Sequence, residues 1–276
     1  MELLRGDIVG MIAGTEPLSR AVLQHAPTLK VVSRCGIGTD NVDLSAASEL
    51  GIEVLNTPDA PSVAVAELTL GLILATLRRI AEADRAVRAG EWRPLMGRLL
   101  TGRVVGVVGY GRIGRKVSAL ARAFGARVLA HDIQPITPDG AVELCALDEL
   151  LSSSDIVTLH LPSAPANRYF FNDARLSLMK RGAILINTAR GELVDEQALA
   201  RVLTSTHIAA AALDTFEQEP YSGPLRDFPQ VTLTAHMGSY TEESRARMEE
   251  EAARNLLDAL ARHGLSPAAA ATRLRA

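Results

Sequence analysis

The sequence predicts an α/β fold built on parallel sheets, and two observations predict it. Short runs rich in β-branched residues alternate with longer alanine- and leucine-rich segments at helical spacing, and this alternation continues through most of the 276 residues. Hydrophobic residues make up 47% of the chain, which is enough to fill substantial cores. The chain is therefore expected to form one large or two ordinary domains.

Eight segments have the length and composition of strands. They cover residues 8–13, 29–34, 104–109, 127–131, 156–160, 183–187, 208–213 and 231–235. Residues 62–90 predict one long helix, and the looser segment at 91–102 predicts a passage between two domains. A small α/β unit precedes this passage. A longer series of strands and helices follows it and ends in a helix over residues 242–262.

Charge and composition narrow the kinds of partner. The net charge is −3 and acidic and basic residues are interspersed, so no broad positive surface is expected for nucleic acid or for an anionic membrane. The most apolar stretch, residues 68–77, is too short to cross a bilayer. Cys35 and Cys145 form no CxxC pair, and the N-terminus has no apolar run behind a basic start. These features predict a reduced, cytoplasmic setting and small-molecule partners.

A glycine motif follows the predicted strand at 104–109 and opens a segment with helical periodicity. It reads Gly109-x-Gly111-x-x-Gly114. The first glycine allows a tight turn, the second lets the backbone approach a pyrophosphate, and the third lets the helix pack closely on the strand. The N–H groups at the start of the helix then point towards the phosphates. Strand, turn and helix together predict a Rossmann-type, doubly wound sheet that binds a dinucleotide.

Asp132 stands at the end of the next predicted strand. A carboxylate at this place accepts hydrogen bonds from the adenosine ribose hydroxyls and repels a 2′-phosphate, so NAD is the predicted cofactor rather than NADP. The alternative is that Asp132 is only a turn residue before Pro135.

Three polar residues follow three predicted strands of the same sheet. Arg190, Glu219 and His236 come after the strands that end at 187, 213 and 235. Ligands of an open parallel sheet bind outside the carboxyl ends of its strands, so all three are expected beside the glycine turn. Taken singly, each has a plainer alternative: a surface cation, a solvated turn acid and a hydrogen-bonded histidine that closes a strand. Taken together beside a dinucleotide turn, they fit one chemistry.

That chemistry is hydride transfer. Oxidation of an alcohol in this way also requires removal of the hydroxyl proton, so the site needs a base that titrates near neutrality. A histidine meets this need, and a neighbouring carboxylate favours imidazolium and orients the ring, which predicts His236 as the acid–base residue and Glu219 as its partner. Arg190 is predicted to bind a substrate carboxylate through two parallel hydrogen bonds. The other histidines and the cysteines show no metal-ligand spacing, so no metal is expected.

Five segments make the chain similar to the D-2-hydroxyacid dehydrogenase family, and more closely to its phosphoglycerate dehydrogenase-like branch. Besides the glycine motif they are SRCGIGTDNVD (33–43), NTPDAPSVAVAELTLGLILA (56–75), NTARGELVDE (187–196), and ALDTFEQEP with TAHMGS. Together they span nearly the whole chain. The resemblance implies an NAD-dependent enzyme that moves a hydride between nicotinamide and C2 of a small D-2-hydroxy or 2-keto acid, with 3-phosphoglycerate as a leading candidate substrate.

The resemblance also implies roles for individual residues. The catalytic arginine, glutamate and histidine of the family fall on Arg190, Glu219 and His236, in agreement with the argument from strand ends. Substrate contacts fall on Arg34, Gly36 and Arg190, although Arg34 has the alternative of a strand-end surface charge. Cofactor contacts fall on the three glycines of the motif and on Ile37, Arg112, Ile113, Asp132, Leu161, Thr188, Ala189, Asp214 and Gly238.

The same resemblance implies a division into domains. A smaller, flavodoxin-like substrate domain is expected over residues 1–72, an NAD-binding domain over 73–262, and a tail over 263–276 that returns to the substrate domain. Family members usually begin with two further strand–helix units, so the substrate domain is expected to be shortened at its N-terminus and to leave the strand at 8–13 with an unpaired edge. A homodimer that involves the helix after Ser62 is also implied.

Two alternatives to this enzyme stay open at this point. One is an NAD(H)-sensing binding protein with negligible turnover, like the corepressor relatives of these dehydrogenases. The other lies within the enzyme class, because phosphite oxidation would use the same kinds of residues.

Overall fold

A computed structural model describes residues 8–136, 140 and 142–265 of the chain. The chain divides into two compact units, and each is described by itself. The large unit runs from Ser62 to Gly238, and the small unit combines the residues up to Pro61 with those from Ser239 onwards. In the part of the chain that the structure describes, no helix is both long enough and apolar enough to span a membrane.

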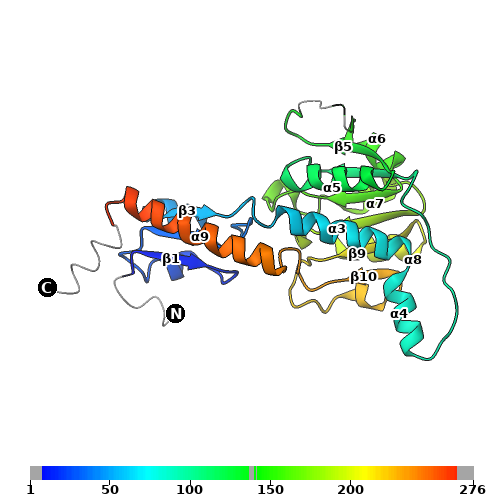
Figure 1. Ribbon diagram of the computed structural model, residues 1–276, viewed down its shortest axis with the longest axis horizontal. Helices are drawn as coiled ribbons and strands as arrows, with labels where there is room; N and C mark the ends of the chain where they lie inside the picture. The colour runs from blue at the N-terminus through cyan, green and yellow to red at the C-terminus, as the bar shows by residue number, and fades with distance from the viewer. Residues whose placement is uncertain (1–7, 137–139, 141, 266–276) are drawn as a thin grey trace. The chain divides into compact units, whose positions relative to one another are not determined.

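The large unit is built on a sheet of parallel strands (Figure 1). Among the described residues its strand order is β10-β9-β8-β7-β4-β5-β6. The strands are β4 (Val104–Val108), β5 (Arg127–His131), β6 (Glu143–Leu144), β7 (Ile156–Leu159), β8 (Ala183–Asn187), β9 (Ile208–Leu213) and β10 (Val231–Leu233). The order runs outward from β4 to β6 and then from β7 to β10 on the other side, so it reverses between β4 and β7. Ligands of such sheets bind at the carboxyl ends of the strands beside this reversal.

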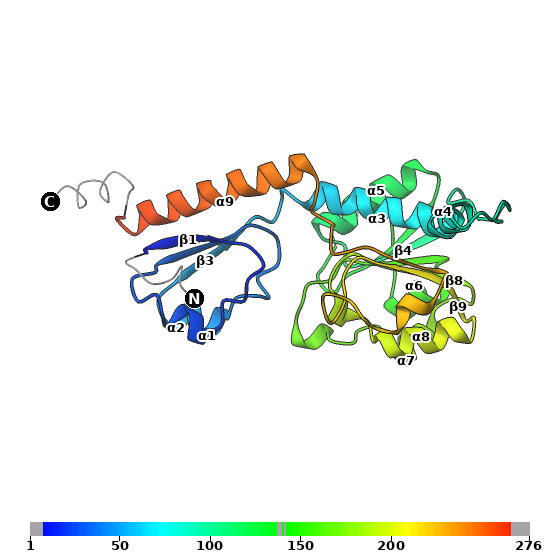
Figure 2. The same ribbon diagram turned by 90° about the horizontal axis from the view of Figure 1, so that it is seen from below.

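Helices cover both faces of this sheet (Figure 2). α3 (Ser62–Leu77) and α5 (Arg112–Ala123) pack together on one face, and α6 (Leu147–Ser153), α7 (Asp173–Leu178) and α8 (Glu196–Thr204) cover the other. Because both faces are covered, every residue of β7 and β8 is buried. Shorter elements of this unit are α4 (Ile80–Arg88) and the 3-10 helices η2 (Pro165–Asn167), η3 (Gly191–Leu193) and η4 (Pro224–Asp227).

The small unit has a parallel sheet of its own. Its described strands, in the order β1-β2-β3, are β1 (Gly10–Ala13), β2 (Val31–Arg34) and β3 (Glu53–Asn56). α1 (Arg20–Leu23) and α2 (Leu44–Glu49) lie on one face, and α9 (Glu242–Arg262) lies on the other (Figure 2). A Cβ on Gly10 would lie only 2.7 Å from the side chain of Leu256, so α9 packs tightly on β1.

The predicted strands are present, and each observed end lies within two residues of its prediction. The predictions missed β3 and β6. Only Val54 and Leu55 are apolar in β3, and β6 is a two-residue edge strand, so neither contains an apolar run long enough to stand out.

The single helix predicted over 62–90 is wrong, because the structure has two helices there. Arg79 lies between α3 and α4 with φ of 53°, a left-handed conformation that an α-helix does not contain. The N–H of Arg98 donates to the carbonyl of Leu77 at 2.8 Å, which closes the end of α3 with a bond from a later segment. The guanidinium of Arg79 pairs with Glu82 in the first turn of α4.

The units of the structure also differ from the predicted domains. All of α3 belongs to the large unit because it packs on α5, β8 and β9, so the division comes after Pro61 and not after residue 72. The segment at 91–102, predicted as a passage between domains, lies inside the large unit. α9, predicted to lie in the NAD-binding domain, instead packs on β1, β2 and β3. Of the predicted tail, His263 contacts Glu53 of β3, and residues 266–276 lie outside the described residues.

Candidate active site

The glycine turn follows β4 at the carboxyl end of the large sheet. Gly109 has φ of 93°, and a Cβ there would lie 2.5 Å from the backbone oxygen of His160. A Cβ on Gly114 would lie 2.1 Å from the carbonyl oxygen of Gly109. The turn therefore needs glycine at 109, and the close packing of α5 on β4 needs glycine at 114. These are the roles predicted from the sequence.

Gly111 is under a different constraint. In the part of the chain that the structure describes, a Cβ at Gly111 would meet no atom within 4 Å apart from its chain neighbours, and its φ of −81° is accessible to any residue. Gly111 caps the N-terminus of α5, where Arg112 and Ile113 form the first turn. The first N–H groups and the dipole of a helix favour an anion at this end. The open space in front of Gly111 fits the predicted pyrophosphate.

Asp132 follows β5 beside this turn. Its Oδ2 accepts the N–H of Tyr110 at 2.7 Å, and its Oδ1 accepts the N–H of Gln134 at 2.9 Å. The carboxylate therefore helps to hold the glycine turn, a role that the sequence does not predict. Its contact with the adenosine ribose stays a prediction.

Arg190 lies in the turn after β8, and Asn187 shapes this turn. The fully buried Asn187 side chain donates to the carbonyl of Arg190 at 2.8 Å and accepts the N–H of Ala189 at 3.1 Å. The guanidinium of Arg190 donates to the carbonyl of Ala189 at 2.7 Å. Thr188 is buried, and its hydroxyl lies 2.8 Å from the hydroxyl of Thr69 on α3. Neither Asn187 nor Thr69 was predicted as a support. Asn187 could have been found from the sequence, because it is a polar residue at the end of an otherwise apolar predicted strand.

His236 and Glu219 are in direct contact. Nδ1 of His236 lies 2.8 Å from Oε2 of Glu219, and the two side chains are 46% and 37% exposed. Glu219 follows β9 and His236 follows β10, so the parallel strands bring them to the edge that carries the glycine turn. The pairing is as predicted, with Nδ1 facing the carboxylate. Because Nδ1 meets Glu219, Nε2 is the ring nitrogen left for proton exchange with a substrate, and that exchange stays a prediction.

A buried carboxylate fixes the turn that carries His236. Oδ1 of Asp214 accepts the hydroxyl of Thr234 at 2.5 Å and the N–H of Met237 at 2.9 Å, and Oδ2 accepts the N–H of Gly238 at 2.9 Å. The sequence predicts Asp214 and Gly238 as cofactor contacts, and those contacts stay predictions. What the structure adds is that Asp214 holds the turn of the predicted acid–base residue.

Comparison with known proteins agrees with this arrangement. The family model described as D-isomer specific 2-hydroxyacid dehydrogenase, NAD binding domain, matches residues 70–238. A glyoxylate reductase from Aeropyrum pernix is 42% identical over 257 residues, which cover 88% of this chain and 77% of that protein. The chain belongs to the D-2-hydroxyacid dehydrogenase family.

Two further relatives indicate the range of this family. A D-3-phosphoglycerate dehydrogenase from Methanocaldococcus jannaschii is 42% identical over 247 residues, which cover 86% of this chain and 47% of that protein. The crystal structure of D-lactate dehydrogenase from Aquifex aeolicus, complexed with NAD and lactic acid, has a TM-score of 0.85 and 29% identity, with 96% of this chain and 85% of that chain covered. The predicted family, α/β fold class, NAD cofactor and dehydrogenase class are confirmed.

Leu161 follows β7 in the large unit of this dehydrogenase, and its predicted contact with the cofactor stays a prediction. The remaining predicted site residues, Arg34, Gly36 and Ile37, lie in the small unit at the carboxyl end of β2. The guanidinium of Arg34 donates to the carbonyl of Cys35, and a Cβ on Gly36 would clash with Arg34. The N–H of Gly36 donates to the hydroxyl of Thr57 at 2.8 Å, and the carbonyl of Ile37 accepts from Asn56 at 2.7 Å. The predicted contacts of these residues with substrate and nicotinamide stay predictions.

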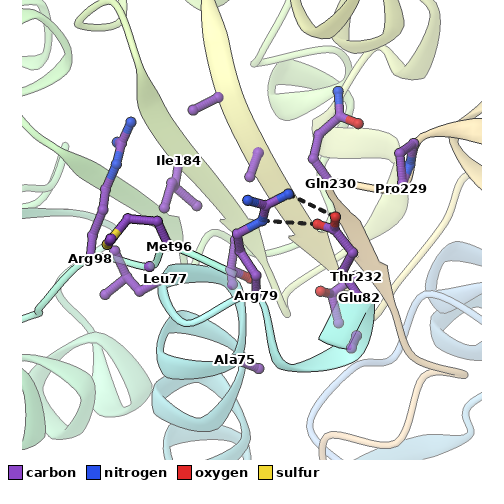
Figure 3. A pocket seen from close by; sticks show the side chains of 15 residues that line it. Ala75, Leu77, Arg79, Glu82, Met96, Arg98, Ile184, Pro229, Gln230 and Thr232 are labelled. Atoms are coloured by element: carbon purple, nitrogen blue, oxygen red, sulfur yellow. Dashed lines mark hydrogen bonds and ion pairs between the residues drawn. The ribbon is translucent and has the colours of Figure 1, made fainter. Parts of the chain in front are cut away.

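A cavity of about 270 Å³ lies elsewhere in the large unit of the dehydrogenase (Figure 3). Ile184, Ala210 and Gln230 line it at the amino ends of β8, β9 and β10, beside the ion pair between Arg79 and Glu82. Because the glycine turn and His236 lie at the carboxyl ends, this cavity is not part of the candidate active site. Within residues 8–136, 140 and 142–265, no group of three or more His, Cys, Asp or Glu residues is arranged to hold a metal ion.

Proposed function

We propose that this dehydrogenase reduces a small 2-keto acid to the 2-hydroxy acid and catalyses the reverse oxidation, with glyoxylate as the first substrate to test. The observation that carries the proposal is the 2.8 Å contact between His236 and Glu219 at the edge with the glycine turn. A predicted acid–base pair at the same carboxyl edge of the sheet as a dinucleotide turn fits hydride transfer that is coupled to proton transfer. The likeness to a glyoxylate reductase supports glyoxylate, and the likeness to a D-3-phosphoglycerate dehydrogenase supports a phosphorylated keto acid.

In the reductive direction His236 acts as the acid. The protonated imidazole gives its Nε2 proton to the carbonyl oxygen of the substrate, which becomes the hydroxyl group. Bound NADH supplies the hydride that forms the new C–H bond at C2. Glu219 accepts a hydrogen bond from Nδ1, so it orients the ring and stabilises its protonated form. In the oxidative direction the neutral imidazole takes the proton back.

Arg190 binds the substrate carboxylate in this proposal. A guanidinium binds a carboxylate through two parallel hydrogen bonds and stabilises negative charge on the neighbouring carbonyl oxygen. The bonds of Asn187 and Ala189 to the Arg190 turn limit its movement and support this role. Arg34 and the N–H of Gly36 are proposed as further substrate contacts, and their support is the family resemblance.

Residues around the glycine turn hold NAD in this proposal. The first turn of α5, with Arg112 and Ile113, contacts the pyrophosphate, and Asp132 contacts the adenosine ribose. Further contacts are proposed for Ile37, Leu161, Thr188, Ala189, Asp214 and Gly238. The open space at Gly111 supports the pyrophosphate position, because among the described residues no atom beyond its two chain neighbours lies within 4 Å of a Cβ there.

The experiment follows NADH absorbance with glyoxylate, pyruvate and 3-phosphohydroxypyruvate, and repeats each assay with NADPH. We expect turnover of at least one acid with NADH, and a loss of about 100-fold or more in His236→Ala, since acid–base groups contribute this much. Tight NADH binding without turnover of any of these acids would overturn the proposal and would favour an NAD(H)-sensing protein.

We also propose that the chain forms a homodimer through residues 80–99. Large apolar side chains are exposed along this segment: Trp92 is 90% exposed and Met96 is 88% exposed, and Ile80, Val87 and Leu99 are more than half exposed. Exposed apolar side chains in such number on one segment are typical of an interface. Light scattering should give twice the mass of one chain, and Trp92→Ala combined with Met96→Ala should shift the mass towards that of one chain. A wild-type mass of one chain would contradict the proposal.

A further inference from the structure

The carboxylate of Glu219 is fixed at both of its oxygens. Oε2 lies 2.8 Å from Nδ1 of His236, and Oε1 accepts the N–H of Phe216 at 3.0 Å. Because the strength of a hydrogen bond depends steeply on its geometry, the position of the Phe216 backbone determines how Glu219 meets the imidazole.

Two residues from the segment after β8 hold the peptide that joins Phe216 to Glu217. A Cβ on Gly191 would lie 1.8 Å from the carbonyl carbon of Phe216 and 2.3 Å from the nitrogen of Glu217, so Gly191 packs directly against this peptide. The N–H of Glu217 donates to Oε1 of Glu196, the first residue of α8, at 3.1 Å. Gly191 directly follows Arg190 in the sequence, so the same peptide meets the turn that carries the proposed substrate-binding arginine.

Tyr221 contacts both Phe216 and Glu196. Its ring stacks on the ring of Phe216, with centroids 4.1 Å apart and planes inclined by 21°. Its hydroxyl accepts the N–H of Leu225 at 3.1 Å and also interacts with Glu196. Burial raises the pKa of the Glu196 carboxyl, and burial raises the pKa of Tyr221 to about 12. Glu196 is therefore a half-buried support and not a solvated acid on the surface of α8.

We propose that the peptide between Phe216 and Glu217 is a junction that sets the position of Glu219 relative to Arg190, with Glu196 and Gly191 as positioning residues for the reaction. The inference rests on the proposed function, because that function assigns proton transfer to His236 and Glu219. Glu196 acts on the reaction through Glu217 and Phe216 and does not touch the substrate. Loss of its carboxylate leaves the N–H of Glu217 without this acceptor and loosens the segment that carries Glu219.

The test compares Glu196→Ala with Glu196→Gln. The glutamine keeps an amide oxygen that accepts the N–H of Glu217, and the alanine does not. With glyoxylate and NADH we expect kcat of Glu196→Ala to fall about tenfold, because small misplacements of a catalytic group cost this much or more. The KM for glyoxylate and the Kd for NADH, measured by fluorescence, should stay unchanged. Glu196→Gln should recover most of the lost kcat. Glu149→Ala, at an exposed glutamate on α6, is the matched control and should behave like wild type.

Gly191→Ala tests the other side of the junction, and circular dichroism and the melting temperature show whether it folds. A folded Gly191→Ala should lose more kcat than Glu196→Ala. If it does not fold, the two Glu196 variants decide alone. An unchanged kcat in Glu196→Ala, or an equal loss in the alanine and glutamine variants, would overturn the inference while turnover by wild type still depends on His236. Wild-type turnover that does not depend on His236 would overturn the proposed function and this inference together.

Discussion

The backbone carbonyl of Asp214 accepts a hydrogen bond from the N–H of His236 at 2.8 Å. The side chain of Asp214 is completely buried, and its carboxylate accepts the N–H groups of Met237 and Gly238. His236 has φ of 49°, a left-handed conformation that costs a non-glycine residue on the order of 1 kcal/mol. The bonds to Asp214 offset this cost and hold the imidazole in the position from which it meets Glu219.

Asp214→Asn should therefore lower activity by loosening the turn of His236. An amide has one oxygen where the carboxylate has two, so the donors at Thr234, Met237 and Gly238 cannot all keep their partner. We expect kcat with glyoxylate to fall about tenfold or more and the melting temperature to fall by several degrees, since a buried hydrogen bond to a charged group contributes about 1.5–3 kcal/mol. Asp148→Asn, at an exposed position, is the control. Wild-type kcat in Asp214→Asn would show that these bonds do not position His236.

Alanine substitutions at two glycines of the dinucleotide turn should affect stability and cofactor binding differently. Gly109→Ala places a Cβ 2.5 Å from a backbone oxygen at φ of 93°, so it should lower both the melting temperature and NADH affinity. A Cβ at Gly111 meets no non-neighbouring atom of the described residues within 4 Å, so Gly111→Ala should keep the melting temperature. Its NADH binding should weaken about tenfold or more, because the methyl group enters the space of the pyrophosphate. Gly71→Ala, inside α3, also meets nothing within 4 Å and should leave NADH binding unchanged. Unchanged NADH affinity in Gly111→Ala would show that the pyrophosphate does not bind in front of Gly111.

Asp132→Ala should change the choice of cofactor. The carboxylate repels a 2′-phosphate, so its removal should raise kcat/KM with NADPH relative to NADH by about tenfold or more. Because Asp132 also accepts the N–H of Tyr110 in the glycine turn, the absolute kcat/KM with NADH should fall as well. Steady-state rates with both cofactors give the ratio. A ratio equal to that of wild type would remove Asp132 from cofactor discrimination.

His160 should make the fold sensitive to mild acid. Burial lowers its pKa to about 3, whereas a histidine in an unfolded chain titrates at about 6.5. Between these values the unfolded chain binds a proton that the folded protein does not. The free energy of unfolding therefore falls as the pH falls below about 6.5, by at most about 1.4 kcal/mol per pH unit from this group.

Urea unfolding of wild type and His160→Gln at pH 7.5 and pH 5.0 measures this contribution. The free energy of unfolding should fall less between these pH values in His160→Gln than in wild type. His25→Gln, at an exposed position on the small unit, should keep the wild-type difference. Parallel behaviour of wild type and His160→Gln would show that the imidazole is protonated in the folded protein.

Most strands of the large unit could be predicted from the sequence, for a simple physical reason. Parallel strands covered on both faces are continuous apolar runs, as in residues 183–186 of β8, and such runs are visible without a structure. The break between α3 and α4 was not visible. The apolar pattern continues through it, and it depends on the left-handed Arg79 and on a bond from Arg98 that is distant in sequence. The assignment of α9 to the small unit likewise depends on contacts with β1, β2 and β3.

Part of the candidate site could likewise be predicted from the sequence, and part could not. The pairing of His236 with Glu219 could be predicted because polar residues that follow neighbouring parallel strands converge at one edge. That Asp214 and Glu196 support this pair could not be predicted, because they act through backbone groups of other segments. Asp214 holds the turn of His236, and Glu196 accepts the N–H of Glu217, and both bonds require the folded positions of loops after different strands.

The central claim is that His236 transfers the proton that accompanies hydride transfer. The most direct measurement is the single-turnover rate of NADH oxidation by glyoxylate in wild type and in His236→Gln, at saturating NADH, with the Kd for NADH measured on the same samples. The proposed mechanism predicts a rate at least about 100-fold lower in His236→Gln, with the Kd for NADH unchanged. An equal single-turnover rate in the two proteins would contradict it.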